Sequence, residues 1–224
     1  MIKKGQKKMP RTNPLATKAT TSIAAPRQSN VQSQLDILRR ANAPENGAFM
    51  KVTEMCKLIY GEDEIEVEDG SLWAVNPNSL QVGFITWSED DQTTAPLEEK
   101  MAFIIGDNAE SEILRSDMEN HPNSRTNSQM AISVSCLTGA DKGQLCQFKS
   151  SSMKGRASIE RLWRELVGAM PEDSAKTHVP VVSLAPTIVK NKKKGSTRFV
   201  EFTLTAVLTN DEAAELTTTG KLPK

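Results

Sequence analysis

The side chains of this 224-residue chain that could do chemistry are mainly lysines, arginines and serines. The two histidines, His121 and His178, have no ligand neighbours at a zinc spacing and no matched nucleophile. The sequence contains no dinucleotide-binding, phosphate-loop, serine-hydrolase or zinc-peptidase motif. We therefore expect a protein that is not an enzyme and has no metal or cofactor.

Acidic side chains offer one catalytic alternative. Glu64, Glu66 and Asp69 lie close together in the sequence, and such carboxylates could hold Mg²⁺ in a nuclease. Acidic clusters on loops are more often solvated surface. We rank a nuclease last among the functions considered.

Basic residues gather at two places in the C-terminal half. One group is predicted at a hairpin tip, where lysines can reach a phosphate backbone without distorting the fold; it comprises Lys190, Lys192, Lys193, Lys194 and Arg198. The other surrounds a run of serines, whose hydroxyls can donate hydrogen bonds to phosphates; it comprises Lys149, Ser150, Ser151, Lys154 and Arg156. A solvated turn is the alternative for either group alone.

Aromatic side chains could add base stacking, which contributes about 1–3 kcal/mol per base. Phe199 is predicted on the face of its strand opposite the apolar residues, and Trp87 on a partly exposed face. Trp73 could be stacking or core, whereas Trp163 lies on the apolar stripe of a helix and is expected in the core. Aromatic residues make up only 4% of the chain, so a platform would have two or three members.

The elements that must position these residues follow from apolar periodicity and turn residues. Strands are predicted over 71–76, 80–87, 101–105, 130–137, 144–149, 179–189 and 198–208, and an amphipathic helix over 156–170. A helix is also predicted over 46–60, with a strand as the alternative, and a short one over 32–41.

Composition divides the chain into three parts. Residues 1–30 have almost no large apolar side chains and are predicted to form a disordered basic arm. Residues 31–208 are predicted to form a single β-rich nucleic-acid-binding domain, and 209–224 a flexible tail. The fold class is mainly β (α+β): an oligonucleotide-binding (OB)-like β-barrel with an inserted amphipathic helix, or alternatively a β-sandwich.

Charge is segregated along the chain although the formal net charge is zero. Residues 1–40 carry nine Lys or Arg against one acid, 41–130 carry five against eighteen acids, and 131–224 carry fourteen against nine. The two basic blocks suit a polyanionic partner. Contact between the arm and the acidic segment of a neighbour would allow a homo-oligomer.

The compartment follows from what the sequence lacks. No apolar stretch is long enough for a membrane span, and no apolar segment follows the basic N-terminus as in a secretory signal. Three widely spaced cysteines are typical of reduced, buried thiols. We expect a soluble intracellular protein without a membrane partner.

Several of these segments resemble bacteriophage proteins. Four segments are similar in their order to phage proteins thought to bind single-stranded DNA with OB-like cores. They are 71–87 (SLWAVNPNSLQVGFITW), 97–101, 148–152 before a helix, and 179–184 before a basic loop and a closing strand. The resemblance covers about 71–208. It implies DNA contacts at the positions Lys149, Ser150, Ser151, Lys190, Lys194, Arg198 and Trp87.

The sequence therefore favours sequence-independent single-stranded DNA binding in phage DNA replication or recombination, in the cytoplasm of an infected bacterial host. Replication proteins are possible further partners. The alternative is a non-catalytic, self-assembling interaction or virion-assembly protein, in which the basic arm and the acidic segment drive association.

Overall fold

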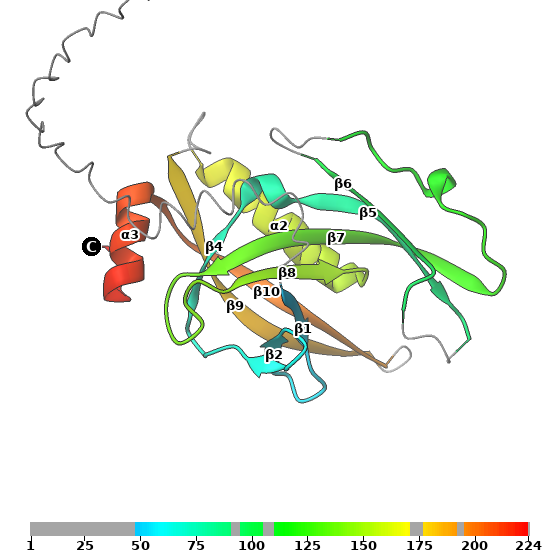
Figure 1. The fold of residues 1–224 in the computed structure, drawn as a ribbon, viewed down its shortest axis with the longest axis horizontal. Helices are drawn as coiled ribbons and strands as arrows, with labels where there is room; N and C mark the ends of the chain where they lie inside the picture. The colour runs from blue at the N-terminus through cyan, green and yellow to red at the C-terminus, as the bar shows by residue number, and fades with distance from the viewer. Residues whose placement is uncertain (1–47, 91–94, 105–109, 171–176, 192–194, 224) are drawn as a thin grey trace, which may run out of the picture.

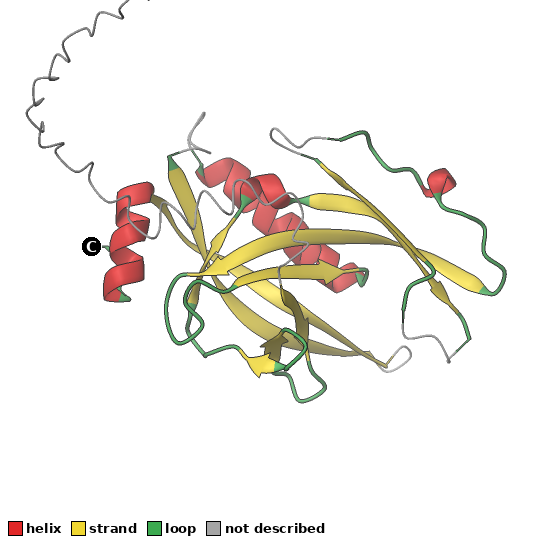
Figure 2. Cartoon of the chain, in the orientation of Figure 1, coloured by secondary structure: helices red, strands yellow, loops and turns green. Residues whose placement is uncertain are grey.

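A ten-stranded mixed sheet organises the residues that the computed structural model describes, which are 48–90, 95–104, 110–170, 177–191 and 195–223 (Figure 1). The mainly β class is thereby confirmed, with two helices packed on the sheet (Figure 2). The predicted disordered arm and the helix over 32–41 lie outside the described residues.

The strands, in chain order, are β1 (Ala48–Val52), β2 (Leu58–Tyr60), β3 (Ile65–Glu66), β4 (Leu72–Val75), β5 (Gln81–Ser88), β6 (Glu98–Phe103), β7 (Ser124–Cys136), β8 (Leu145–Ser150), β9 (His178–Asn191) and β10 (Gly195–Thr209). The helices are α2 (Met153–Ala169) and α3 (Asn210–Thr219), with short 3₁₀ turns η1 (Pro77–Ser79) and η3 (Arg115–Asp117). No described helix has the length and apolar character needed to cross a membrane.

The strand order is β10-β9-β4-β7-β8-β1-β2-β3, and β5 and β6 continue the sheet from the first half of β7. Neighbouring strands are antiparallel except β1 and β8, which are parallel. Strand β7 pairs with β5 over 124–131 and with β4 over 134–136. The chain leaves β4 for β5 through η1, because Pro77 has no backbone N–H to continue a ladder.

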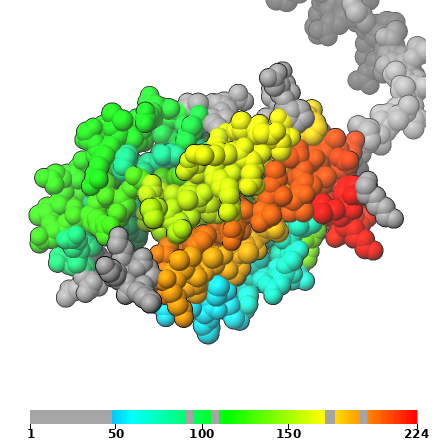
Figure 3. All heavy atoms as spheres, turned by 180° about the vertical axis from the view of Figure 1, so that it is seen from behind, coloured from blue at the N-terminus to red at the C-terminus, as the bar shows by residue number. Residues whose placement is uncertain are grey.

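The main core lies between one face of the sheet and α2. Trp73, Ile132 and Phe202 are almost fully buried there, and the rings of Phe148 and Phe202 meet edge to face with centroids 5.6 Å apart. Helix α2 contributes its apolar stripe, of which Leu162 is fully buried. In the view from behind, α2 lies between the residues of β5–β7 and those of β9–β10 (Figure 3).

The C-terminal segment corrects a sequence prediction. Residues 210–219 were expected in a flexible tail, but they form α3, which packs Ala213 and Leu216 into a second apolar cluster with β9 and β10. A capping box between Thr209 and Glu212 starts this helix, and Gly220 in the left-handed conformation ends it. The cluster is small because the sheet buries its larger side chains on the opposite face.

The segment 46–60 corrects a second prediction from the sequence. Its apolar spacing predicted a helix, but the structure has β1 and β2 joined by a turn at Cys56, whose φ is +60°. The strand alternative was therefore right for this segment. This matters for function, because β1 places Phe49 and Lys51 on the outer face of the sheet.

Candidate nucleic-acid interface

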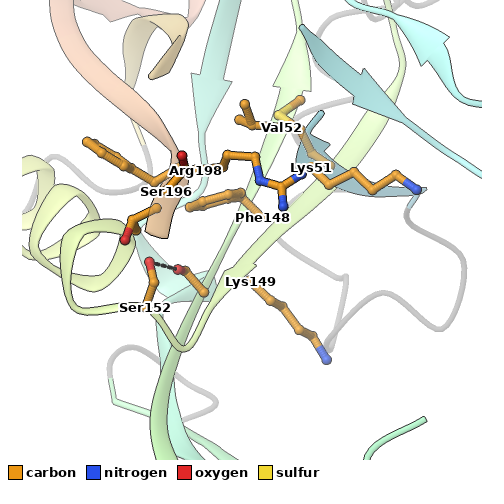
Figure 4. Close-up of a pocket in the computed structure, with 11 residues that line it drawn as sticks. Lys51, Val52, Phe148, Lys149, Ser152, Ser196 and Arg198 are labelled. Atoms are coloured by element: carbon orange, nitrogen blue, oxygen red, sulfur yellow. Dashed lines mark hydrogen bonds between the residues drawn. The ribbon is translucent and has the colours of Figure 1, made fainter. Parts of the chain in front are cut away.

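An open cleft of about 390 Å³ lies where β1, β8 and β10 approach one another (Figure 4). Each strand brings one cation to its lining: Lys51 from β1, Lys149 from β8 and Arg198 from β10. In Figure 4, Arg198 extends across the cleft beside Phe148, while Lys51 and Lys149 extend outward away from Ser152. Three cationic residues from distant parts of the sequence therefore line or border one opening.

Serine hydroxyls and a helix start form the other side of the cleft, where Ser150, Ser152 and Ser196 are lining residues. Ser152 caps α2, since its Oγ accepts a hydrogen bond from the Gly155 N–H at 3.0 Å, and the Ser150 and Ser152 hydroxyls lie 3.1 Å apart. A side chain at Gly155 would not fit, because a Cβ there would lie 2.0 Å from Ser150 Oγ. The N-terminus of a helix attracts anions, so this side of the cleft attracts phosphate as the three cationic residues do.

Each of the three cations has a carboxylate partner outside the cleft. Lys51 Nζ is 2.8 Å from a Glu64 oxygen and Arg198 is 3.4 Å from Glu54. Both pairs are exposed to solvent, with 61% and 86% of the glutamate side chains accessible. Exposed ion pairs contribute about 0–1 kcal/mol, so a phosphate can replace these glutamates at low cost.

Glu99 of β6 is the most enclosed of the three partners. One of its oxygens accepts hydrogen bonds from Lys149 Nζ and from Gln129 Nε2, each at 2.8 Å. Strands β6 and β8 are separated in the sheet by β5 and β7. The contact therefore requires the β5–β6 hairpin to curl over the outer face of the sheet. Within this hairpin Gly83 permits β5 and β6 to approach closely, because a Cβ there would lie 1.9 Å from the Lys100 carbonyl oxygen.

The basic residues and serines predicted as phosphate contacts divide into four sets. Lys149, Ser150 and Arg198 line the cleft, whereas Ser151, Lys154 and Arg156 do not line it and lie before or in the first turn of α2. The Nε of Arg156 is buried without a hydrogen-bond partner. Lys190 is exposed at the end of β9. The remaining hairpin lysines, Lys192, Lys193 and Lys194, lie outside the described residues.

Two of the three candidate stacking residues are buried: Phe199, against its predicted exposure, and Trp73, for which stacking and core were both open. Trp73 is fully buried, because β4 is an interior strand covered on both faces, and its indole N–H donates to Ser71 Oγ at 3.3 Å. Phe199 is only 9% exposed and belongs to the main core, although its edge lines the cleft. Trp87 is half-buried on the outer face of β5, opposite Arg125.

Sequence reasoning missed four residues at or beside the cleft. Lys51 and Phe49 were missed because their segment was predicted mainly as a helix. Ser152 was noted only as part of a serine run, and Ser196 not at all. Serine before the helix is a capping signal that could have placed Ser152 at its start.

The most strongly shifted pKa values belong to groups that hold the scaffold. Burial raises the pKa of the Cys136 and Cys146 thiols from 9.0 to about 12, and both lie in the main core. Burial also raises the pKa of Tyr60 to about 12, helped by its hydrogen bond of 2.7 Å to Asp141. That bond ties β2 to the turn between β7 and β8. These thiols are poor nucleophiles near neutral pH.

Within the described part of the chain, no group of three or more His, Cys, Asp or Glu side chains is arranged to hold a metal ion. Two carboxylates of the nuclease alternative instead contact lysines, Glu64 with Lys51 and Glu66 with Lys57. His121 lies near two glutamates, at 3.9 and 3.8 Å.

Comparison with known proteins gives no identification. No protein-family model matches the chain, and no curated protein and no solved structure gives a significant match. The function must therefore be argued from the cleft and the strand topology.

Proposed function

We propose that this chain binds single-stranded DNA without sequence preference and without catalysis, using the cationic cleft to hold the phosphate backbone. The observation that carries the proposal is the convergence of Lys51, Lys149 and Arg198 on one opening beside three serine hydroxyls. Lysine and arginine neutralise phosphates, and hydroxyls add hydrogen bonds that carry no sequence information. Such contacts bind any sequence.

The strand topology supports an OB-like core for this function. In a Greek key the fourth strand returns over a long connection to lie beside the first, in the spatial order 4-1-2-3. With β4 and β5 together as the first strand, β7, β8 and β9 follow as second, third and fourth, and their order β9-β4-β7-β8 is that of a Greek key. Strand β10 is then the fifth, and α2 lies between the third and fourth strands.

The position of the cleft supports the same proposal. OB-folds bind oligonucleotides on the face of strands two and three and through the loops after strands one and four. Here these parts are β7 and β8, the acidic connection 89–123 and the β9–β10 hairpin. Lys149 belongs to the third strand, Glu99 to the first connection, and Arg198 follows the hairpin. Lys190, exposed at the end of β9, pairs across the hairpin with the cleft residue Ser196 and would extend the cationic surface along the backbone of a bound strand.

The size of the cleft favours a single strand. Its volume of about 390 Å³ is that of a small-molecule pocket, which spans roughly 300–1,000 Å³. This volume has room for one nucleotide unit. With the resemblance of residues 71–208 to phage proteins, we infer a role in phage DNA replication or recombination inside an infected bacterium, with replication proteins as further partners.

The test is the affinity of single charge-removal variants for fluorescent oligo-dT. Lys51→Gln, Lys149→Gln and Arg198→Gln are each expected to weaken binding by roughly 3- to 10-fold at low salt, as expected for one lost phosphate contact. Arg164→Gln is the matched control, because Arg164 is 75% exposed on α2 and pairs with Glu160. Equal affinity for all five proteins, or no binding by the unmodified chain, would refute the proposal.

A further inference from the structure

Phe49 is the one aromatic side chain that the described residues leave largely exposed, with 57% of its surface accessible. The other nine aromatic residues are buried or half-buried; they are Tyr60, Trp73, Phe84, Trp87, Phe103, Phe148, Trp163, Phe199 and Phe202. Single exposed apolar residues are common on protein surfaces. The surroundings of Phe49 therefore decide what its exposure means.

These surroundings are cationic and border the cleft. Phe49 lies on β1 opposite Gln147 of β8, and Lys51, two residues further along β1, is on the same face. Lys149 Nζ lies over the ring of Phe49, 5.1 Å from its centroid. An ammonium at this distance is attracted to the ring. A single nucleotide could therefore contact both the Lys149 charge and the exposed ring of Phe49.

We propose that Phe49 is the residue on which an unpaired nucleobase stacks while Lys149 and Lys51 hold the neighbouring phosphates. The inference rests on the proposed function, since it assigns the base contact of the same cleft. It replaces the stacking role that sequence predicted for Trp73 and Phe199, whose rings are buried. It also gives the cleft a preference for single strands, because bases in a duplex are already stacked and are out of reach of a side chain on a strand.

The geometry of β1 makes Phe49 suited to this role. A phenylalanine on a strand has few rotatable bonds, and β1 is held on both sides, by β2 and by β8. The ring is therefore positioned before DNA binds, and little conformational entropy is lost on binding. A flat hydrocarbon ring offers no hydrogen bond to distinguish bases, so its stacking is tolerant of sequence.

The experiment compares two ligands of equal length, oligo-dT and an oligonucleotide of abasic residues, which has the phosphates but no bases. Phe49→Leu is expected to weaken oligo-dT binding by roughly 5- to 150-fold, the range for one stacked base, and to leave binding of the abasic strand unchanged. Phe49→Trp is expected to retain oligo-dT affinity. Val167→Ala is the control, because Val167 is a 63% exposed apolar residue on α2.

The outcomes separate this inference from the proposed function. If the unmodified protein binds neither ligand, the proposed function fails, and this inference with it. If it binds oligo-dT and Phe49→Leu binds equally well, the cleft binds phosphates but Phe49 does not stack, and only this inference is overturned. Loss of self-association by Phe49→Leu with oligo-dT affinity unchanged would instead assign Phe49 to an interface between copies and also overturn it. Thermal melting confirms that each variant is folded.

Discussion

Replacing Glu99 with glutamine should make this protein bind single-stranded DNA more tightly. In the free protein Glu99 holds Lys149 at 2.8 Å, where a phosphate would otherwise lie. The two side chains are 29% and 23% exposed, so water still reaches the pair in part, and it contributes about 1 kcal/mol, the upper end of the range for exposed pairs. DNA must break this pair before Lys149 can contact a phosphate. Glutamine removes the charge but retains a carbonyl oxygen that can accept from Gln129.

The magnitude follows from two contributions. The pair itself costs up to about 1 kcal/mol to break. Repulsion between a freed carboxylate and a phosphate roughly 6 Å away adds about 0.7 kcal/mol at the dielectric constant of water. We expect a net gain of about 1 kcal/mol for Glu99→Gln, which is roughly fivefold in the dissociation constant. The slope of log affinity against log salt should stay the same, because Lys149 contacts one phosphate in both proteins.

Fluorescence anisotropy with labelled oligo-dT, over about 50 to 300 mM salt, measures both the affinity and the slope. Glu165→Gln is the control for net charge, since Glu165 is exposed on α2 and lies roughly 18 Å along the helix axis from the first residue of α2. In the double variant Glu99→Gln/Lys149→Gln the gain should vanish, because there is no lysine left to release. Equal binding by Glu99→Gln and the unmodified protein, or the same gain from Glu165→Gln, would refute the reasoning.

Three further predictions concern the scaffold and the aromatic residues. Gly155→Ala should destabilise the fold by roughly 1–3 kcal/mol in urea unfolding, because its Cβ overlaps a serine hydroxyl, while Gly168→Ala, with open space around it, should be neutral or stabilising. The free energy of unfolding should keep its full value below about pH 9 and fall between about pH 9 and pH 12, by roughly 1 kcal/mol per thiol per pH unit. The reason is that the Cys136 and Cys146 thiols ionise at lower pH in the unfolded chain than in the folded chain. Equal stability at about pH 8 and pH 10.5 would contradict this. Trp87→Phe should remove most of the tryptophan quenching caused by oligo-dT, since Trp87 is half-buried on the outer face of β5; undiminished quenching would assign the signal elsewhere.

Strands with clear apolar patterns could be predicted from sequence, and so could the long helix. The apolar pattern of 179–208 predicted the two strands of the β9–β10 hairpin, and the apolar stripe that includes Leu162 predicted α2. The first half of β7 could not be predicted, because residues 124–129 are polar and become a strand through their pairing with β5, with Gln129 alone buried. Such pairing comes from tertiary structure and leaves no periodic signal.

The candidate site was predicted in part. The sequence singled out Lys149 and Arg198 because charge concentrated near strand ends is visible in it, and the structure places both in the lining of the cleft. Phe49 and Lys51 were missed because apolar residues three and four apart favoured a helix over a short strand. Trp73 could not be assigned, because only the position of β4 between β7 and β9 decides that its ring is covered. Local spacing does not determine which strands become interior.

The central claim is that Lys51, Lys149 and Arg198 together hold the phosphate backbone of single-stranded DNA. The most direct test measures the slope of log affinity for oligo-dT against log salt in the full chain and in the triple variant Lys51→Gln/Lys149→Gln/Arg198→Gln. Because both proteins keep the same basic N-terminal sequence, any binding by that segment cancels in the comparison. We predict a triple-variant slope shallower by about 2, as three lost single-strand phosphate contacts require. An unchanged slope, with both proteins folded, would contradict the claim.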